Sequence, residues 1–148
     1  MTISKRRGID RRARLDWLPH TDGGQLIVPD YKTTSSAEPH AFQRSIWSFG
    51  YDIQNVFYTD AVQAAGLAED VGFQFIAQEV TPPYLVTVHE LDYLSLAVGR
   101  QRVDEACAVF RECTETNTWP GYSSEVEVIA PPSWLADQYG LDDMELVI

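Results

Sequence analysis

The feature that most constrains the fold is an apolar run, residues 26–28, that leads through Pro29 to Asp30 and Lys32. Side chains alternate along a β-strand, so Asp30 and Lys32 would lie on the same face. Proline cannot donate a ladder hydrogen bond, so Pro29 indicates a strand edge or a bulge, where side chains are often re-aimed near active sites. The sequence therefore predicts a strand that presents a carboxylate and an ammonium together.

An Asp-Gly-Gly sequence at residues 22–24 separates this strand from an earlier patterned run, which is typical of a β-hairpin. We expect strands over about 11–18 and 25–31. Asp16 and Asp30 would then be cross-strand partners, because they are equally distant from the centre of the turn. Adjacent carboxylates repel unless a cation lies between them, and oxygen-rich sites suit Mg²⁺ or Mn²⁺. The hairpin therefore predicts a divalent metal at these two aspartates.

Each of these residues also has a simpler interpretation. Asp16 could be a surface aspartate on a solvated strand face, although a charge among apolar neighbours is costly without a partner. Asp30 and Lys32 could form an ordinary surface ion pair.

A second motif, Gln54-x-x-x-Tyr58, follows along the chain. The order Asp16, Asp30-x-Lys32 and then this motif resembles the PD-(D/E)XK nuclease superfamily, and within it the exodeoxyribonuclease VIII-like (RecE- and RecB-like) phage-type exonucleases. The segments 49–51, 119–122 and 132–134 resemble the same branch. The resemblance covers about residues 11–134.

The resemblance implies a mixed α/β fold, with a restriction-endonuclease-like core in which helices flank a central mixed sheet. It also implies that Asp16 and Asp30 ligate Mg²⁺ (or Mn²⁺), with the backbone carbonyl of Tyr31 as a further ligand. In the mechanism that the resemblance implies, the metal would polarise the scissile phosphate and lower the pKa of its water, which would be the nucleophile. Lys32 stabilises the charge that develops on the phosphate.

Gln54 and Tyr58 are four residues apart, so they share one face of a helix. The resemblance implies that both belong to the catalytic set and contact the DNA backbone or water. The alternative is a surface pair with Tyr58 half-buried. The residues expected to contact DNA are Arg11, Arg12, Arg14, Thr33, Gln54 and Tyr58.

The net charge of −11 argues at first against a nucleic-acid partner. The charge is unevenly distributed, however, because residues 1–14 hold six bases and one acid. This basic end lies beside the expected site and could hold a phosphate backbone, while the acidic remainder would limit loose binding. A solvated terminal arm explains the same charges equally well.

The 148 residues are enough for one domain with its own core, and we expect a single nuclease-like domain over 1–148. Residues 1–9 would form a flexible basic arm or a fragment of a strand. No apolar run is long enough for a membrane helix, and no apolar segment follows the basic end as in a secretory signal. Cys107 and Cys113 are expected on different faces of one helix, as free thiols of a cytoplasmic protein.

The rest of the chain predicts alternating helices and strands. Ser35 and Ser36 are expected to cap a helix that begins near Pro39, and Gly50 is a natural break before the next helix. Asp92 is a plausible cap for a long helix. The expected ranges are helices at 51–65, 93–115 and 133–139 and strands at 73–80, 84–90 and 125–129.

We therefore expect a metal-dependent DNA exonuclease that acts on double-stranded DNA ends, in phage or prophage recombination or end resection. The expected partner protein is a single-strand annealing protein, and the chain is expected to form a homo-oligomer. No membrane partner is expected. Relatives have a helical region before the hairpin that often adds a metal ligand, and only Asp10 precedes Asp16 as a candidate here. The rival is a truncated remnant that binds DNA or a partner chain without cleaving.

Overall fold

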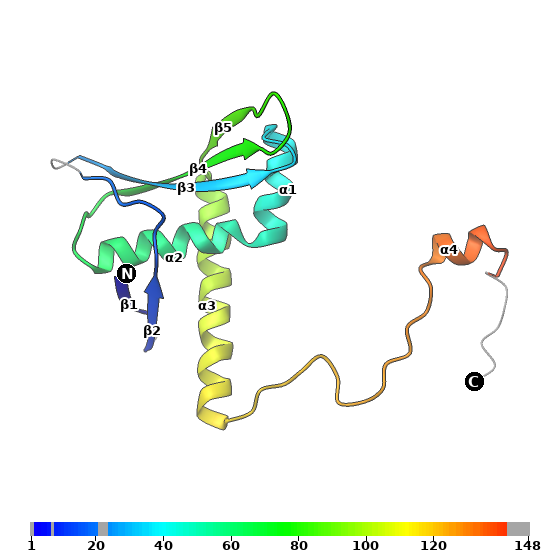
Figure 1. The fold of residues 1–148 in the computed structure, drawn as a ribbon. Coiled ribbons are helices and arrows are strands. Elements are labelled where there is room, and N and C mark those ends of the chain that lie inside the picture. Colours follow the sequence, from blue (N-terminus) through cyan, green and yellow to red (C-terminus); the bar gives the residue numbers. More distant parts are fainter. Residues whose placement is uncertain (1, 7, 21–23, 142–148) are drawn as a thin grey trace. The chain divides into compact units, whose positions relative to one another are not determined.

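The computed structural model describes residues 2–6, 8–20 and 24–141. The chain divides into two compact units, Met1–Asn117 and Thr118–Ile148 (Figure 1). This division leaves the expectation of one nuclease-like domain a prediction. The first unit holds β1 (Thr2–Arg6), β2 (Ile9–Ala13), β3 (Leu26–Thr34), α1 (Pro39–Phe49), α2 (Tyr51–Ala64), β4 (Val71–Glu79), β5 (Val86–His89) and α3 (Tyr93–Thr116), and the second holds α4 (Ser133–Gln138).

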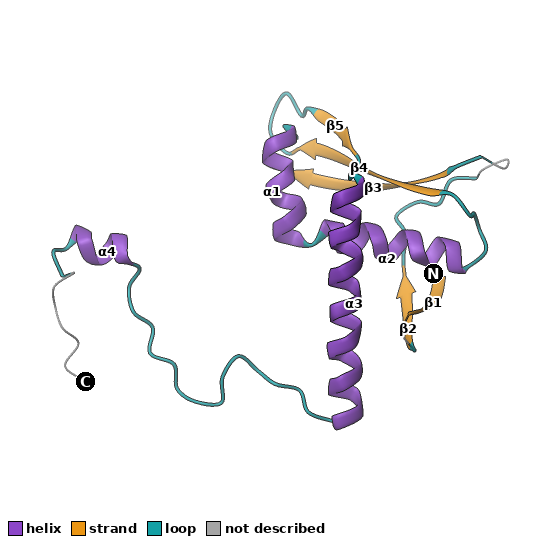
Figure 2. Ribbon diagram, turned by 180° about the vertical axis from the view of Figure 1, so that it is seen from behind, coloured by secondary structure: helices purple, strands orange, loops and turns teal. Residues whose placement is uncertain are grey.

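A mixed three-stranded sheet with the order β3-β4-β5 is the centre of the first unit. β3 and β4 are parallel, with Asp30 opposite Phe75, and β4 and β5 are antiparallel. Parallel neighbours need a crossover connection, which α1 and α2 supply here (Figure 2). The predicted mixed α/β fold, with helices against a mixed sheet, is confirmed.

The predicted hairpin is wrong. β3 pairs with β4, whereas β2 pairs with β1 in a separate two-stranded sheet in which Ile9 lies opposite Arg6. Asp16 lies in the loop that follows β2, and it is not a cross-strand partner of Asp30. Part of the expected turn lies outside the described residues. The physical reason is that β4 buries Phe75 and its neighbours on the same face as β3, a gain that no local turn motif reveals.

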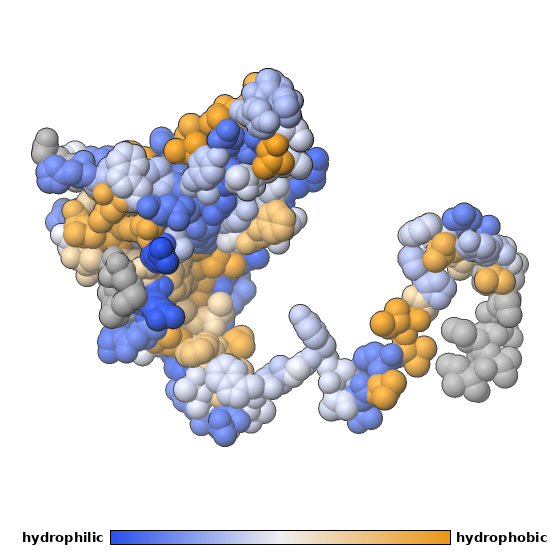
Figure 3. Space-filling view, in the orientation of Figure 1, coloured by the Kyte–Doolittle hydropathy of each residue, from blue (hydrophilic) through white to orange (hydrophobic). Residues whose placement is uncertain are grey.

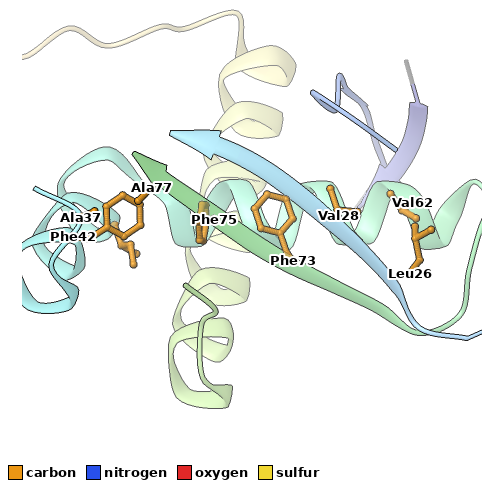
Figure 4. Close-up of a cluster of buried hydrophobic side chains, with 9 residues drawn as sticks. Leu26, Val28, Ala37, Phe42, Val62, Phe73, Phe75 and Ala77 are labelled. Carbon is orange, nitrogen blue, oxygen red and sulfur yellow. The ribbon is translucent and has the colours of Figure 1, made fainter. Parts of the chain in front are cut away.

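The main core lies between one face of the sheet and the helices α1 and α2 (Figure 4). Alternate residues of β3 and β4 point into it, as the pleat of a sheet requires. Phe42 of α1 packs its ring against Phe75 and stacks it on His89. The buried members are Leu26, Val28, Ala37, Phe42, Ile46, Val62, Phe73, Phe75 and Ala77.

The opposite face of the sheet is more open to solvent. Tyr31 on β3 is 50% exposed, and Val86 and Val88 on β5 are 54% and 53% exposed. Figure 3 shows apolar side chains at the surface near the top of the first unit, where β5 lies. Asp30 and Lys32 alternate with Tyr31 along β3, so their side chains lie on the covered face.

Glycine and a capping acid set the limits of α1 and α2. Gly50 has a φ of 69°, a left-handed conformation that favours glycine, and it ends α1 one residue before α2 begins. The N-cap of α1 is Glu38, whose carboxylate accepts from the amide of Ala41 at 2.8 Å. The break at Gly50 is confirmed, but the serine caps are wrong, because Ser36 forms a turn with Thr34 instead.

α3 crosses α2 at a close contact (Figure 2). A Cβ at Gly99 would meet the backbone carbonyl oxygen of Asp52 at 2.7 Å, so glycine alone permits this approach. Arg102 on the next turn binds the Asp52 carboxylate. Asp92 caps the start of α3 by accepting from the amide of Ser95 at 2.8 Å, as predicted.

The basic N-terminal segment is held in the first unit. Of the two alternatives for residues 1–9, the structure has the strand, since β1 spans Thr2–Arg6. Arg6 donates to Asp104 at 2.6 Å and to Asp60 at 2.5 Å, both on helices. The hydrogen bond to Asp104 raises the pKa of Arg6, burial lowers it and Asp60 raises it again, for a net rise. Part of the predicted basic patch is therefore neutralised internally.

The second unit has little regular structure. α4 confirms the helix expected near 133–139. The strand expected at 125–129 is wrong, because these residues are exposed and have no regular structure.

In the first unit, α3 carries both cysteines. Cys107 and Cys113 are buried free thiols, as predicted. Across the described residues, no helix combines the length and the apolar character needed to cross a membrane.

Candidate active site

The site begins on β3, where Asp30 and Lys32 point from the covered face of the sheet. Asp30 is only 2% exposed, and Lys32 Nζ lies 2.5 Å from its Oδ2. The side chain of Lys32 is 16% exposed. Asp30 is thus buried and Lys32 half-buried on one face, as the alternation predicts, so they do not form an ordinary surface ion pair.

Gln54 on α2 connects the two charged groups. Its Nε2 donates to Asp30 Oδ1 at 2.7 Å, and its Oε1 accepts from Lys32 Nζ at 2.9 Å. One amide thereby presents a donor to the carboxylate and an acceptor to the ammonium. We call Asp30, Lys32 and Gln54 the acid–lysine–amide triangle.

The Asp30 carboxylate is incompletely satisfied. Within the described part of the chain, its buried Oδ2 has Lys32 as an ion-pair partner but no partner in hydrogen-bond geometry. Burial raises the pKa of Asp30, contact with Lys32 and Gln54 lowers it, and the charge of Asp16 raises it again, for a net rise. Asp16 itself lies in an exposed loop and not in a paired strand.

The backbone of β3 presents a further oxygen at the edge of the sheet. The backbone amide of Leu26 donates to the carbonyl of Asp70 at 2.9 Å, and the carbonyl of Thr34 accepts from the amide of Val80 at 3.1 Å. The backbone groups of the even-numbered residues of β3 therefore point toward β4. In a parallel ladder the intervening residues face the other way, which places the carbonyl of Tyr31 on the open edge of β3. Pro29 has the same orientation, so its missing N–H costs no ladder bond.

The donors at this corner fit a hard divalent cation. They are oxygens of the Asp30 carboxylate, whose Oδ2 is ion-paired with Lys32, and of the Tyr31 carbonyl. The Asp16 carboxylate is a further candidate because its charge acts on Asp30. Mg²⁺ and Mn²⁺ prefer such ligands, and Mg²⁺ keeps several waters when bound. The described residues contain no group of three or more His, Cys, Asp or Glu side chains that could hold a metal. A metal here would therefore rely on two carboxylates and a carbonyl.

The structure corrects one predicted DNA contact, Arg11. This side chain is only 6% exposed, lies over the ring of Phe57 at 4.7 Å and donates to Asp60 at 3.4 Å. It is buried because alternate residues of β2, Arg11 and Ala13, point inward. Arg11 is thus unavailable to a substrate, whereas Arg12 and Arg14 are exposed.

The side chains of the remaining predicted residues lie in two places, the opposite face of the sheet and the helix α2. The side chains of Tyr31 and Thr33 lie on the opposite face of the sheet from the triangle, and the Tyr31 hydroxyl donates to Gln78 at 2.5 Å. Tyr58 is half-buried, with its ring edge-on to Phe73 at 6.1 Å between centroids. Contact of Thr33 or Tyr58 with DNA stays a prediction.

Sequence reasoning missed Tyr51. Its ring lies 4.6 Å from Lys32 Nζ, a cation–π contact. The spacing from Tyr51 to Gln54 is three residues on one helix, which places both on one face. That spacing was the available indication.

Comparison with known proteins gives the family of the chain and a similar fold. The chain belongs to the family described as PDDEXK-like domain of unknown function (DUF3799), which matches residues 1–132. A crystal structure from Eubacterium rectale, described as a "putative exonuclease", has a similar fold, with a TM-score of 0.64 and 16% sequence identity. The similarity covers 93% of this chain and 54% of that one, so the chain spans about half of its length. No curated protein sequence matches the chain.

These findings confirm the predicted PD-(D/E)XK superfamily. The finer placement in the exodeoxyribonuclease VIII-like branch stays a prediction.

Proposed function

We propose that the chain is a metal-dependent deoxyribonuclease that degrades DNA from double-stranded ends, as an exonuclease of the exodeoxyribonuclease VIII type. The observation that carries the proposal is the acid–lysine–amide triangle. A buried carboxylate is ion-paired with an ammonium that Gln54 also holds, on an edge strand of the sheet in a PDDEXK-like domain. Perturbed ionisable groups of this kind are concentrated at functional sites.

Each residue of the site has a distinct role in the proposal. Asp30, Asp16 and the Tyr31 carbonyl would hold Mg²⁺ or Mn²⁺. When bound, such an ion lowers the pKa of its water and polarises the scissile phosphate. Lys32 stabilises negative charge on the phosphate, because its ammonium is held in place before the substrate arrives. Gln54 holds the side chains of Asp30 and Lys32 in position through its two hydrogen bonds.

The substrate is held by groups outside the triangle. Exposed Arg12 and Arg14 supply positive charge for the phosphate backbone. Thr33 and Tyr58 are further candidates, on the resemblance alone. We further propose a cytoplasmic role in phage recombination or end resection, with a single-strand annealing protein as partner and a homo-oligomer as the assembled form.

A cleavage assay tests the proposal. The chain is incubated with Mn²⁺ or Mg²⁺ and either linear duplex DNA or the same DNA as a covalently closed circle. We expect the linear form to be degraded, the closed circle to resist, and EDTA to stop the reaction. Asp30→Asn and Lys32→Ala should each reduce the rate by about 10²-fold or more, as for other preorganised charge-stabilising groups.

Asp137→Asn is the matched control, because it removes one exposed carboxylate from α4 in the second unit. It should cleave like the unmodified chain. Cleavage that survives EDTA, or that Asp30→Asn leaves intact, would contradict the proposal. Binding of linear DNA without cleavage by the unmodified chain would instead favour the non-catalytic alternative.

A further inference from the structure

Among the described residues, the ammonium of Lys32 has an ion-pair partner, a hydrogen-bond acceptor and an aromatic ring as neighbours. Asp30 Oδ2 lies at 2.5 Å, Gln54 Oε1 at 2.9 Å and the ring of Tyr51 at 4.6 Å from its centroid. The first two belong to the triangle described above. Tyr51 is the neighbour to which the proposed function assigns no role.

A lysine needs such confinement if its charge is to act at one place. Its ammonium is a point charge at the end of a flexible four-carbon stem, and it loses rotamer freedom when it is held. A second carboxylate in place of the ring would hold it firmly but would also cancel its charge. An aromatic face attracts a cation through its quadrupole, so it confines the ammonium and leaves its net charge in place.

Tyr51 is itself held rigidly. It is the first residue of α2, directly after Gly50 with its φ of 69°. Its ring stacks on Phe75 at 5.7 Å and lies 6.1 Å from the ring of Phe42, both of them buried core residues. A ring fixed by the core provides a fixed wall for the ammonium.

We propose that Tyr51 is a positioning residue that fixes the ammonium of Lys32 for phosphodiester cleavage through its ring face. It acts through Lys32, and its hydroxyl takes no part. This inference rests on the proposed function, because it assigns a purpose to the position of Lys32. Its first test does not depend on cleavage.

The first test is the proton NMR shift of the ε-methylene group of Lys32, which an adjacent aromatic face moves upfield. We expect the upfield shift in the unmodified chain and in Tyr51→Phe, which keeps the ring. We expect its loss in Tyr51→Leu. Phe49→Leu is the matched control, because Phe49 is 70% exposed and its ring lies 5.7 Å from that of Tyr51. The control should keep the shift.

The second test is cleavage of linear duplex DNA by the same variants. Tyr51→Leu should lower kcat about ten-fold with little change in KM, since a cation–π contact is lost and the substrate contacts remain. Tyr51→Phe and Phe49→Leu should stay within about two-fold of the unmodified chain.

The two tests separate the possible failures. An unchanged Lys32 shift in Tyr51→Leu would overturn the inference, and so would a lost shift with an unchanged kcat. If Tyr51→Phe loses kcat as fully as Tyr51→Leu, the hydroxyl and not the ring face is responsible, which also overturns it. If the unmodified chain cleaves no DNA, the proposed function fails and the positioning role fails with it, whereas the NMR shift still decides whether the ring holds Lys32.

Discussion

Two buried aspartates, Asp52 and Asp30, differ in how their carboxylate oxygens are paired. Asp52 is 0% exposed, and both of its oxygens accept from Arg102, at 2.7 and 2.8 Å. Asp30 is 2% exposed, but its Oδ2 is held by the Lys32 ion pair without hydrogen-bond geometry to any described residue, and the charge of Asp16 repels it. The Asp52 carboxylate, with both oxygens hydrogen-bonded, connects α2 to α3, whereas we propose that the Asp30 carboxylate keeps capacity for a metal.

The largest expected effect breaks the satisfied half of this comparison. Arg102→Met should lower the free energy of unfolding by about 3 kcal/mol, because it leaves the Asp52 charge buried without its partner. Urea unfolding measures this loss. Arg100→Met, at an exposed position on the same helix, is the control and should cost less than about 0.5 kcal/mol. Equal losses in the two variants would show that the pair does not stabilise the crossing.

A smaller effect tests the helix contact beside that pair. Gly99→Ala should cost about 1 to 2 kcal/mol, because the new Cβ meets the backbone of Asp52 at 2.7 Å and backbone cannot move aside cheaply. Alanine favours a helix over glycine, so a gain in stability would show that the helices can separate without cost. Gly121→Ala, which meets nothing within 4 Å, serves as the control in thermal unfolding.

The smallest expected effect is the pH dependence of stability that Asp30 contributes. The pKa of Asp30 lies above its ordinary value of 3.8, so the folded state holds this proton longer than the unfolded state does. The stability that this group contributes is fully present below pH 3.8 and is lost as pH rises through the raised pKa. Asp30→Asn cannot ionise and should escape that loss.

Urea unfolding of the unmodified chain and Asp30→Asn across pH 3 to 8 (roughly the window in which carboxyl groups titrate) checks this sign. The stability of Asp30→Asn relative to the unmodified chain should rise with pH and then level off. Asp137→Asn removes the same charge from an exposed position and controls for net charge. A relative stability that falls with pH would mean that Lys32 favours ionised Asp30 more than burial disfavours it.

Much of the site could be predicted from short-range patterns. Alternation along one strand placed Asp30 and Lys32 on one face, and helical spacing placed Gln54 and Tyr58 on one helix. The helix break at Gly50 and the cap at Asp92 follow from local chemistry in the same way.

The parts that failed depend on contacts between distant segments. The pairing of β3 with β4 spans residues more than 40 apart, and the Asp-Gly-Gly sequence suggested a nearer partner. Arg11 was assigned to DNA because charge alone cannot show that Asp60 and Phe57 bury it. The predicted serine caps are wrong because Glu38, the residue directly before Pro39, has the extended backbone conformation of an N-cap.

The central claim is that Asp30 is a metal ligand and not a structural carboxylate. Calorimetric titration of the 148-residue chain with Mn²⁺ tests it most directly, with Asp30→Asn, Asp16→Asn and the control Asp137→Asn beside it. We expect weak binding at a single site, abolished in Asp30→Asn, weakened in Asp16→Asn and unchanged in Asp137→Asn. Binding by Asp30→Asn that equals that of the unmodified chain would contradict the account.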